Sequence, residues 1–126
     1  MGATVNSELS GKVAIVTGAG RMRGIGRATA VILARMGSNV VVTGTGRNPD
    51  TFPHDEKDVG WRDIDSTVEE IQANGVRGLP LVVDVSSEMD VRRMIDSTIE
   101  EFGRLDIIVN NAAAPYGPDR VPVLDL

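Results

Sequence analysis

The chain of 126 residues contains no cysteine, one histidine and few aromatic residues. Without cysteine it has no disulfides, no thiolate nucleophile and no cysteine-based zinc site. His54 alone offers little scope for a histidine-rich metal centre, and we interpret its neighbours Asp55 and Glu56 as solvated loop residues, so no metal site is predicted. Aromatic residues make up only 3% of the chain, so we expect an aliphatic core.

Long hydrophobic runs are also missing. The longest has five residues, far fewer than a membrane span needs. Nothing near the start resembles a signal peptide, and Asn6 occupies the position at which N-myristoylation requires Ser or Thr. We therefore expect a cytoplasmic protein without a membrane partner.

Charge is distributed unevenly along the chain, whose formal net charge is −5. Residues 1–47 hold six basic residues and one acid, Glu8, whereas the remainder holds seven basic residues and seventeen acids. A basic, glycine-rich opening would suit an anionic ligand, although a chance cluster of solvated arginines gives the same count. The overall negative charge argues against a nucleic-acid partner.

The sequence does contain a regular alternation of strand and helix patterns. Short apolar runs, rich in β-branched residues, predict strands at residues 12–17, 39–43, 79–83 and 105–110, each typical of a strand buried on both faces. The fold class is therefore α/β: a doubly wound, Rossmann-type parallel sheet with helices on both faces. Residues 1–126 would form the N-terminal part of one such domain, incomplete at its C-terminal end, where the fourth strand is an exposed edge.

Three helices are predicted between these strands. The first is expected to face the sheet with one stripe of residues: Ile25, Thr29, Ile32, Leu33 and Met36. The second should bury Ile64, Val68 and Ile71, with Asp63 or Asp65 as its N-cap.

Residues 44–62, before the second helix, are predicted to be an irregular loop of unusual length. Trp61 either anchors this loop to the domain or faces a substrate, and we favour the anchoring interpretation. Nothing else in the loop identifies a ligand.

Glycine and polar residues gather at the carboxyl ends of the predicted strands. Residues 18–26 follow the first strand, 44–47 the second, Asp84 the third and 110–113 the fourth. In a doubly wound sheet ligands bind at this rim. Glycines between a strand and a helix let the backbone approach a ligand, and the helix start offers free N–H groups to a phosphate. Residues 18–26 therefore predict a nucleotide-phosphate turn, although a plain tight turn could also use these glycines.

Three of these segments resemble the signatures of short-chain dehydrogenases/reductases. Residues 17–26 resemble the family's Thr-Gly-x-x-x-Gly-Ile-Gly, Asp84-Val85 its Asp-Val after strand three, and residues 110–113 its Asn-Asn-Ala-Gly. The segments occur in the family's order and cover most of the chain. Two departures stand out: five residues separate Gly18 from Gly24 where the family pattern has three, and Ala113 replaces a glycine.

The resemblance implies which residues hold a dinucleotide. Asp84 would bond to the adenine amino group, Val85 would line the adenine pocket, and Asn111 with Ala112 would contact a ribose through the backbone. Asp84 could also cap the helix that follows it. The candidate cofactor-binding residues are Gly18, Gly20, Arg21, Met22, Arg23, Gly24, Ile25, Gly26, Thr45, Arg47, Asp84, Val85, Asn111, Ala112 and Ala113.

The end of the second predicted strand bears on the choice of cofactor. Sites that prefer NAD place an acid there to bind the ribose 2′-hydroxyl, but this chain has Gly44 and no acid before Asp50. Arg47, together with Arg21 or Arg23 from the glycine-rich turn, could instead bind a 2′-phosphate. We therefore predict NADP rather than NAD.

The family's catalytic Tyr-x-x-x-Lys pair is not recognisable. Tyr116 is the only tyrosine and Arg120 follows four residues later, but Pro115, Gly117 and Pro118 prevent a normal helix there. An arginine also cannot take the place of the lysine that lowers the tyrosine pKa. No catalytic residue is assigned, and these 126 residues alone are predicted to be inactive.

The resemblance implies an NADP-dependent oxidoreductase that transfers hydride between nicotinamide and a carbonyl or secondary alcohol, homo-oligomeric when full length. The alternative is a non-catalytic dinucleotide-binding module, such as a redox sensor or pseudo-enzyme. A serine and a Tyr-x-x-x-Lys motif encoded beyond Leu126 would favour the enzyme. A methyltransferase is disfavoured because no acid follows the second strand, and a phosphate-loop NTPase is excluded because no Gly-Lys-Ser/Thr follows the glycines.

Overall fold

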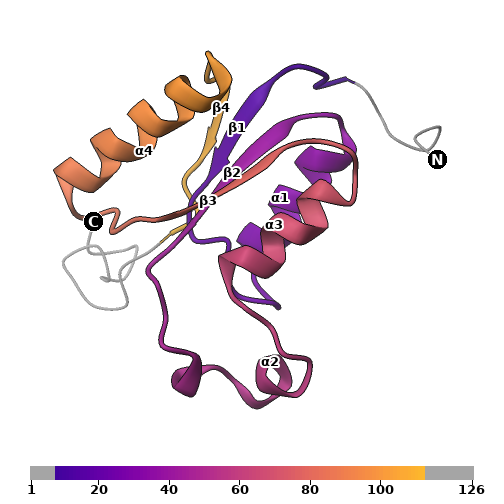
Figure 1. Cartoon of the computed structure of the whole chain (residues 1–126), viewed down its shortest axis with the longest axis vertical. Coiled ribbons are helices and arrows are strands. Elements are labelled where there is room, and N and C mark those ends of the chain that lie inside the picture. Colours follow the sequence, from indigo (N-terminus) through magenta and orange to yellow (C-terminus); the bar gives the residue numbers. More distant parts are fainter. Residues whose placement is uncertain (1–7, 113–126) are drawn as a thin grey trace, which may run out of the picture.

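The computed structural model describes residues 8–112, which form a four-stranded parallel sheet with helices on both faces (Figure 1). In chain order the elements are β1 (Val13–Val16), α1 (Ile25–Arg35), β2 (Asn39–Gly44), a 3₁₀ turn η2 (Pro49–Thr51), α2 (His54–Asp58), α3 (Ile64–Gln72), β3 (Gly78–Val82), α4 (Glu88–Phe102) and β4 (Ile107–Val109). The strand order is β3-β2-β1-β4, and every neighbouring pair is parallel. The predicted doubly wound α/β class is confirmed.

The two faces of the sheet bury different strand residues. Val16, Val40 and Val42 belong to the cluster that packs against α1 and α3, whereas Ile15 and Val41 pack with Met94 of α4 on the other face. Successive side chains of a strand point to opposite faces, so a sheet covered on both sides needs apolar residues at every strand position. This requirement explains the continuous apolar runs of the sequence.

Helix α1 contacts the sheet with a different face from the predicted one. Its buried residues are Gly26, Ala30 and Ala34, while Ile25 is 77% and Ile32 53% exposed. The small residues recur every four positions and so form one stripe, which lets the helix backbone approach β1 and β2 closely. The predicted stripe was therefore wrong at its two isoleucines. Helix α3, in contrast, buries Ile64, Val68 and Ile71 as expected.

The sheet order places β1 at its centre. The chain leaves β1 toward β2 and β3 on one side and reaches β4 on the other, so the order reverses between β1 and β4. The carboxyl ends on either side of such a reversal leave a crevice above the sheet. β4 is one of the two edge strands of the described sheet, β3 being the other, and Ile108 on β4 is 46% exposed.

The segment between β2 and α3 is less irregular than predicted. It contains η2 and the five-residue helix α2, and it extends away from the sheet at the end where β1 and β2 finish (Figure 1). Within residues 8–112 no helix is both long and apolar enough to cross a membrane.

Candidate functional site

A cavity of about 650 Å³ opens at the carboxyl ends of the strands. It is lined by ten of the fifteen predicted residues: Gly18, Gly20, Arg21, Gly24, Thr45, Arg47, Asp84, Val85, Asn111 and Ala112. Met22, Arg23, Ile25 and Gly26 do not line it, and Ala113 lies outside the described residues. Its volume is in the range of pockets that enclose small molecules and cofactors.

The glycine-rich turn forms one wall of this cavity. Gly18 has a φ of +67°, and a side chain there would lie 2.8 Å from the Cα of Ala112. A side chain at Gly26 would collide with the carbonyl of Gly18 and lie 2.7 Å from Nδ2 of Asn111. These two glycines therefore hold the turn, the start of α1 and the chain after β4 together.

The start of α1 is open to an anion. Its N-cap is Gly24, which offers no side-chain cap, and the first turn of the helix carries no acidic residue. The first N–H groups of an α-helix have no partner within the helix, and the helix dipole is positive at this end. With a glycine-lined cavity in front of it, this helix start can accept a phosphate group.

A buried threonine joins β1 to the chain after β4. Oγ1 of Thr17, which is 3% exposed, accepts the N–H groups of Asn111 at 3.1 Å and Ala112 at 3.0 Å. Nδ2 of Asn111 in turn donates to the carbonyl of Gly18 at 2.9 Å. The bonds fix the cavity wall opposite the one formed by β2 and β3.

Asp84 lines the cavity just beyond β3 and does not cap α4. Its Oδ1 accepts hydrogen bonds from the hydroxyl of Ser86 at 2.6 Å and from its N–H at 2.9 Å. These bonds lower the pKa of Asp84 below its ordinary value, the hydroxyl bond most strongly. The N-cap of α4 is Ser87, which accepts the N–H of Asp90. The carboxylate of Asp84 is therefore charged and not engaged as a helix cap.

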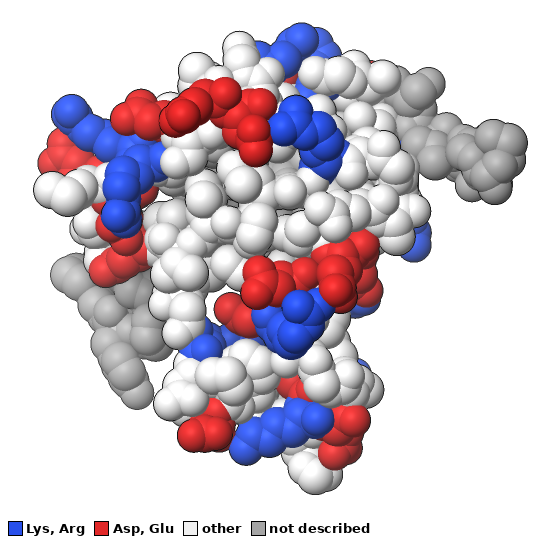
Figure 2. Space-filling model, viewed as in Figure 1, with Lys and Arg blue, Asp and Glu red and all other residues white. Residues whose placement is uncertain are grey.

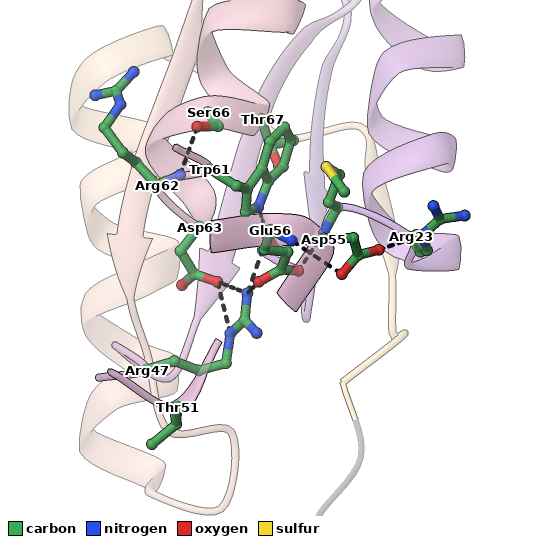
Figure 3. A network of polar contacts seen from close by, with 12 residues as sticks. Arg23, Arg47, Thr51, Asp55, Glu56, Trp61, Arg62, Asp63, Ser66 and Thr67 are labelled. Carbon is green, nitrogen blue, oxygen red and sulfur yellow. Dashed lines mark hydrogen bonds and ion pairs between the residues drawn. The ribbon is translucent and has the colours of Figure 1, made fainter. Parts of the chain in front are cut away.

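Residues from the segment between β2 and α3 fasten the glycine-rich turn (Figure 3). Nε1 of Trp61 donates to the carbonyl of Gly20 at 2.6 Å, and Oε2 of Glu56 accepts the N–H of Met22 at 2.9 Å. Oγ1 of Thr67, at the start of α3, donates to the carbonyl of Ala19 at 2.7 Å. The anchoring interpretation of Trp61 is thus confirmed.

Arg47 is not a free cation at the rim. Its guanidinium lies between two carboxylates (Figure 3): Nε and Nη2 donate to Oδ1 of Asp63 at 2.9 and 2.6 Å, and Nη2 is 3.1 Å from Oε1 of Glu56. The three side chains are 13%, 12% and 3% exposed, respectively. Oε1 of Glu56 makes this ion pair without accepting a hydrogen bond from the residues described. The cluster of Arg47, Glu56 and Asp63 therefore holds one positive and two negative charges.

Asp63 is the one acidic residue among the five cavity residues that were not predicted; the other four are Thr43, Gly44, Val83 and Ser86. We expected Asp63 or Asp65 to cap α3, and Asp63 is the N-cap by position, but its side chain makes no capping bond. Its φ of +61° makes it the one residue other than glycine with a positive φ among residues 8–112. Such a conformation costs about 1–3 kcal/mol and persists only where the surroundings impose it. The sequence carries no local signal for this, because the partner of Asp63 is sixteen residues away.

A comparison with known protein families identifies the family of this chain. The family model described as short chain dehydrogenase matches residues 12–125. The chain belongs to this family.

Relatives of this chain support the family assignment in sequence and in structure. A short-chain dehydrogenase/reductase of Aspergillus oryzae is 44% identical over 119 residues, which are 94% of this chain and 39% of that protein. The crystal structure of a short chain dehydrogenase from Mycobacterium thermoresistibile is 31% identical with a TM-score of 0.71, over 92% of this chain and 39% of that one. The crystal structure of a short chain dehydrogenase from Mycobacterium paratuberculosis bound to NAD is 36% identical with a TM-score of 0.65, over 93% of this chain and 43% of that one. The chain thus spans about two fifths of the length of these relatives.

Three of the six basic residues in the opening of the chain, Arg23, Arg27 and Arg47, pair with later acids. Arg23 pairs with Asp55, and Arg27 pairs with Glu70. Figure 2 shows basic and acidic side chains mixed over α3, α4 and the α2 segment on the face it presents. Among the residues described, Arg21 makes no ion pair and lines the cavity.

His54, Asp55 and Glu56, which we interpreted as solvated loop residues, lie in the short helix α2, and the interpretation was wrong for Glu56, which is 2% exposed. His54 is 3.4 Å from Asp58 on the exposed side of α2, whereas Asp55 pairs with Arg23 and Glu56 points inward. Among residues 8–112, no group of three or more histidine and acidic side chains is arranged to hold a metal ion.

Proposed function

We propose that the complete protein is an NADP-dependent short-chain oxidoreductase and that this chain is its cofactor-binding portion. It would transfer hydride between the nicotinamide and a carbonyl or secondary alcohol. The observation that carries the proposal is the glycine-lined cavity in front of the uncapped start of α1. A hydroxysteroid dehydrogenase of Clostridium, 39% identical over 82% of this chain, and the NAD-bound mycobacterial structure support the reaction class and the cofactor class.

The residues of the cavity suit the parts of a dinucleotide. A pyrophosphate would receive the first N–H groups of α1, where Gly24 brings no side chain in the way. The charged carboxylate of Asp84 can accept a hydrogen bond from the adenine amino group, and Val85 can form an apolar wall beside the adenine ring. Asn111 and Ala112 present backbone to a ribose. The nicotinamide supplies the hydride chemistry, and these residues bind and orient it.

Arg21 is the residue on which we rest the preference for NADP. It lines the cavity without an ion pair among the residues described, whereas Arg23 and Arg47 are held by carboxylates. A guanidinium binds a phosphate with charge-assisted hydrogen bonds, which the 2′-hydroxyl of NAD would not match. The preference for NADP remains a prediction.

Calorimetric titration of the complete polypeptide with NADPH and NADH tests the proposal. We expect NADPH to bind more tightly and Arg21→Gln to weaken NADPH by about tenfold while changing NADH little. Arg35→Gln, which removes the same charge from the exposed end of α1, is the matched control. Binding of neither dinucleotide would reject the function, and tighter binding of NADH would reject the preference.

Three further expectations belong to the same proposal. Residues 1–126 alone should not reduce carbonyl compounds, because no catalytic residue of the family is recognisable in them. A homo-oligomeric assembly and a cytoplasmic location of the complete protein also remain predictions. Carbonyl reduction by the isolated 126 residues would contradict the first of them.

A further inference from the structure

We propose that Asp63 is the specificity-determining residue of the ribose end of the site: its carboxylate neutralises Arg47 and weakens the binding of a 2′-phosphate. The inference rests on the proposed function, since it concerns where a dinucleotide binds. It is independent of which dinucleotide the wild-type protein prefers, because it concerns the change that Asp63 makes to that preference.

Asp63 and Ile64 occupy the space in which the end of β2 would otherwise present a side chain. A Cβ at Gly44 would lie 2.9 Å from Cγ2 of Ile64 and 3.1 Å from Oδ2 of Asp63, and a Cβ at Gly20 would lie 2.7 Å from Cγ of Asp63. An acid at the end of the second strand is the usual partner of the ribose 2′-hydroxyl. Here position 44 has no room for that acid, and a carboxylate reaches the same space from the start of α3.

The ion pair with Asp63 offsets the positive charge of Arg47, so that Arg47 attracts a phosphate only weakly. Both Nε and Nη2 of Arg47 are directed at Oδ1 of Asp63, and Glu56 adds a second negative charge. Cζ of Arg47 lies over the ring of Phe52, 4.4 Å from its centroid, and this contact supports the guanidinium from a further side. A 2′-phosphate placed here would meet a cluster of net negative charge, and like charges at short range repel strongly.

The fold does not require this carboxylate as a helix cap. Asp63 stands at the N-cap of α3 without bonding to an N–H group of the helix. No hydrogen bond from the residues described reaches its Oδ2, and the residue lines the cavity. Its side chain is therefore available to accept a hydrogen bond from a ribose hydroxyl.

The test is the ratio of NADPH to NADH affinity, measured by calorimetry on the complete polypeptide. Asp63→Asn removes the charge at constant shape, while Glu56 and Phe52 still hold Arg47. We expect the ratio to rise about tenfold in favour of NADPH. Asp65→Asn is the matched control, because it removes the same charge from the exposed first turn of α3, and its ratio should stay within about twofold of wild type.

Asp63→Gly is the second variant if the asparagine variant does not fold. Glycine adopts a positive φ without strain, so this variant removes the charge and the backbone cost together. It should raise the ratio in the same direction.

An unchanged ratio in a folded variant that binds both dinucleotides would overturn the inference. A fall of the ratio would also overturn it, because Asp63 would then orient Arg47 toward the phosphate. Failure of the wild-type protein to bind either dinucleotide is a separate result, since it rejects the proposed function itself.

Discussion

Replacing Thr17 by valine tests whether one hydroxyl holds the two sides of the rim together. Valine has nearly the same shape but no acceptor, so the N–H groups of Asn111 and Ala112 lose their bonds of 3.1 and 3.0 Å. The N–H of Asn111 keeps the carbonyl of Val109 at 3.1 Å, whereas the N–H of Ala112 keeps no other acceptor among the residues described. A buried donor without a partner costs about 1–3 kcal/mol. Both residues are half-buried, so water partly replaces the lost acceptor. We therefore expect the free energy of unfolding to fall by about 2 kcal/mol in total.

Urea unfolding of the complete polypeptide, followed by circular dichroism, measures this loss. The slope with denaturant should stay constant, so that the change in midpoint reports stability alone. Thr29→Val is the matched control, because its hydroxyl donates only to the carbonyl of Ile25 one turn earlier in α1, and its effect should stay within about 0.5 kcal/mol. A Thr17 variant as stable as this control would refute the argument that the hydroxyl fixes the rim.

Two further predictions concern the turn and the edge of the sheet. Gly26→Ala should displace the start of α1 from Gly18 and lower dinucleotide affinity, measured by calorimetry, at least tenfold. Ala28→Ser, on the exposed side of the same helix and outside the cavity lining, should change the affinity far less, and equal effects of the two substitutions would contradict this. The pKa of Asp106 is lowered to about 2, first by Arg104 and then by the N–H of Val13. A carboxyl whose pKa is lower in the folded state stabilises the fold at pH values above its pKa in the unfolded chain, which is 3.8 for Asp106. This stabilisation is lost as the pH falls toward 2. Asp106→Asn should therefore make the free energy of unfolding depend less on pH between about pH 4 and pH 2. A profile as steep as that of the wild type would contradict it.

The parts of the fold that the sequence predicted depend on local patterns. Val40 to Val42 and Val13 to Val16 carry the strand signal in consecutive residues, and each strand end lies next to its glycine or polar residues. Parallel strands then bring those ends to one edge whatever the details of the loops. For this reason the rim and ten of its residues followed from the sequence alone.

The parts that the sequence missed depend on contacts between distant residues. The stripe of α1 was misjudged because large apolar residues were expected inward, whereas the close approach of helix and sheet buries Gly26, Ala30 and Ala34. Asp63 was taken for a cap because its position fits one, and only the packing of three segments directs its carboxylate to Arg47. The absence of an acid at Gly44 therefore did not mean that the cavity has no acid there.

The lengthened glycine-rich turn and the long segment between β2 and α3 are physically coupled. The stretch from Gly20 to Met22 belongs to the lengthened turn, and its carbonyl and N–H groups bond to Trp61 and Glu56 of that segment. A turn extended without these partners would leave its polar backbone groups to water and its path undetermined. Conversely, Glu56 is 2% exposed and would be a buried charge without the N–H of Met22 and the guanidinium of Arg47. Each segment therefore satisfies the polar groups of the other, and shortening either one alone should lower the free energy of unfolding, measured by urea denaturation, more than shortening both together.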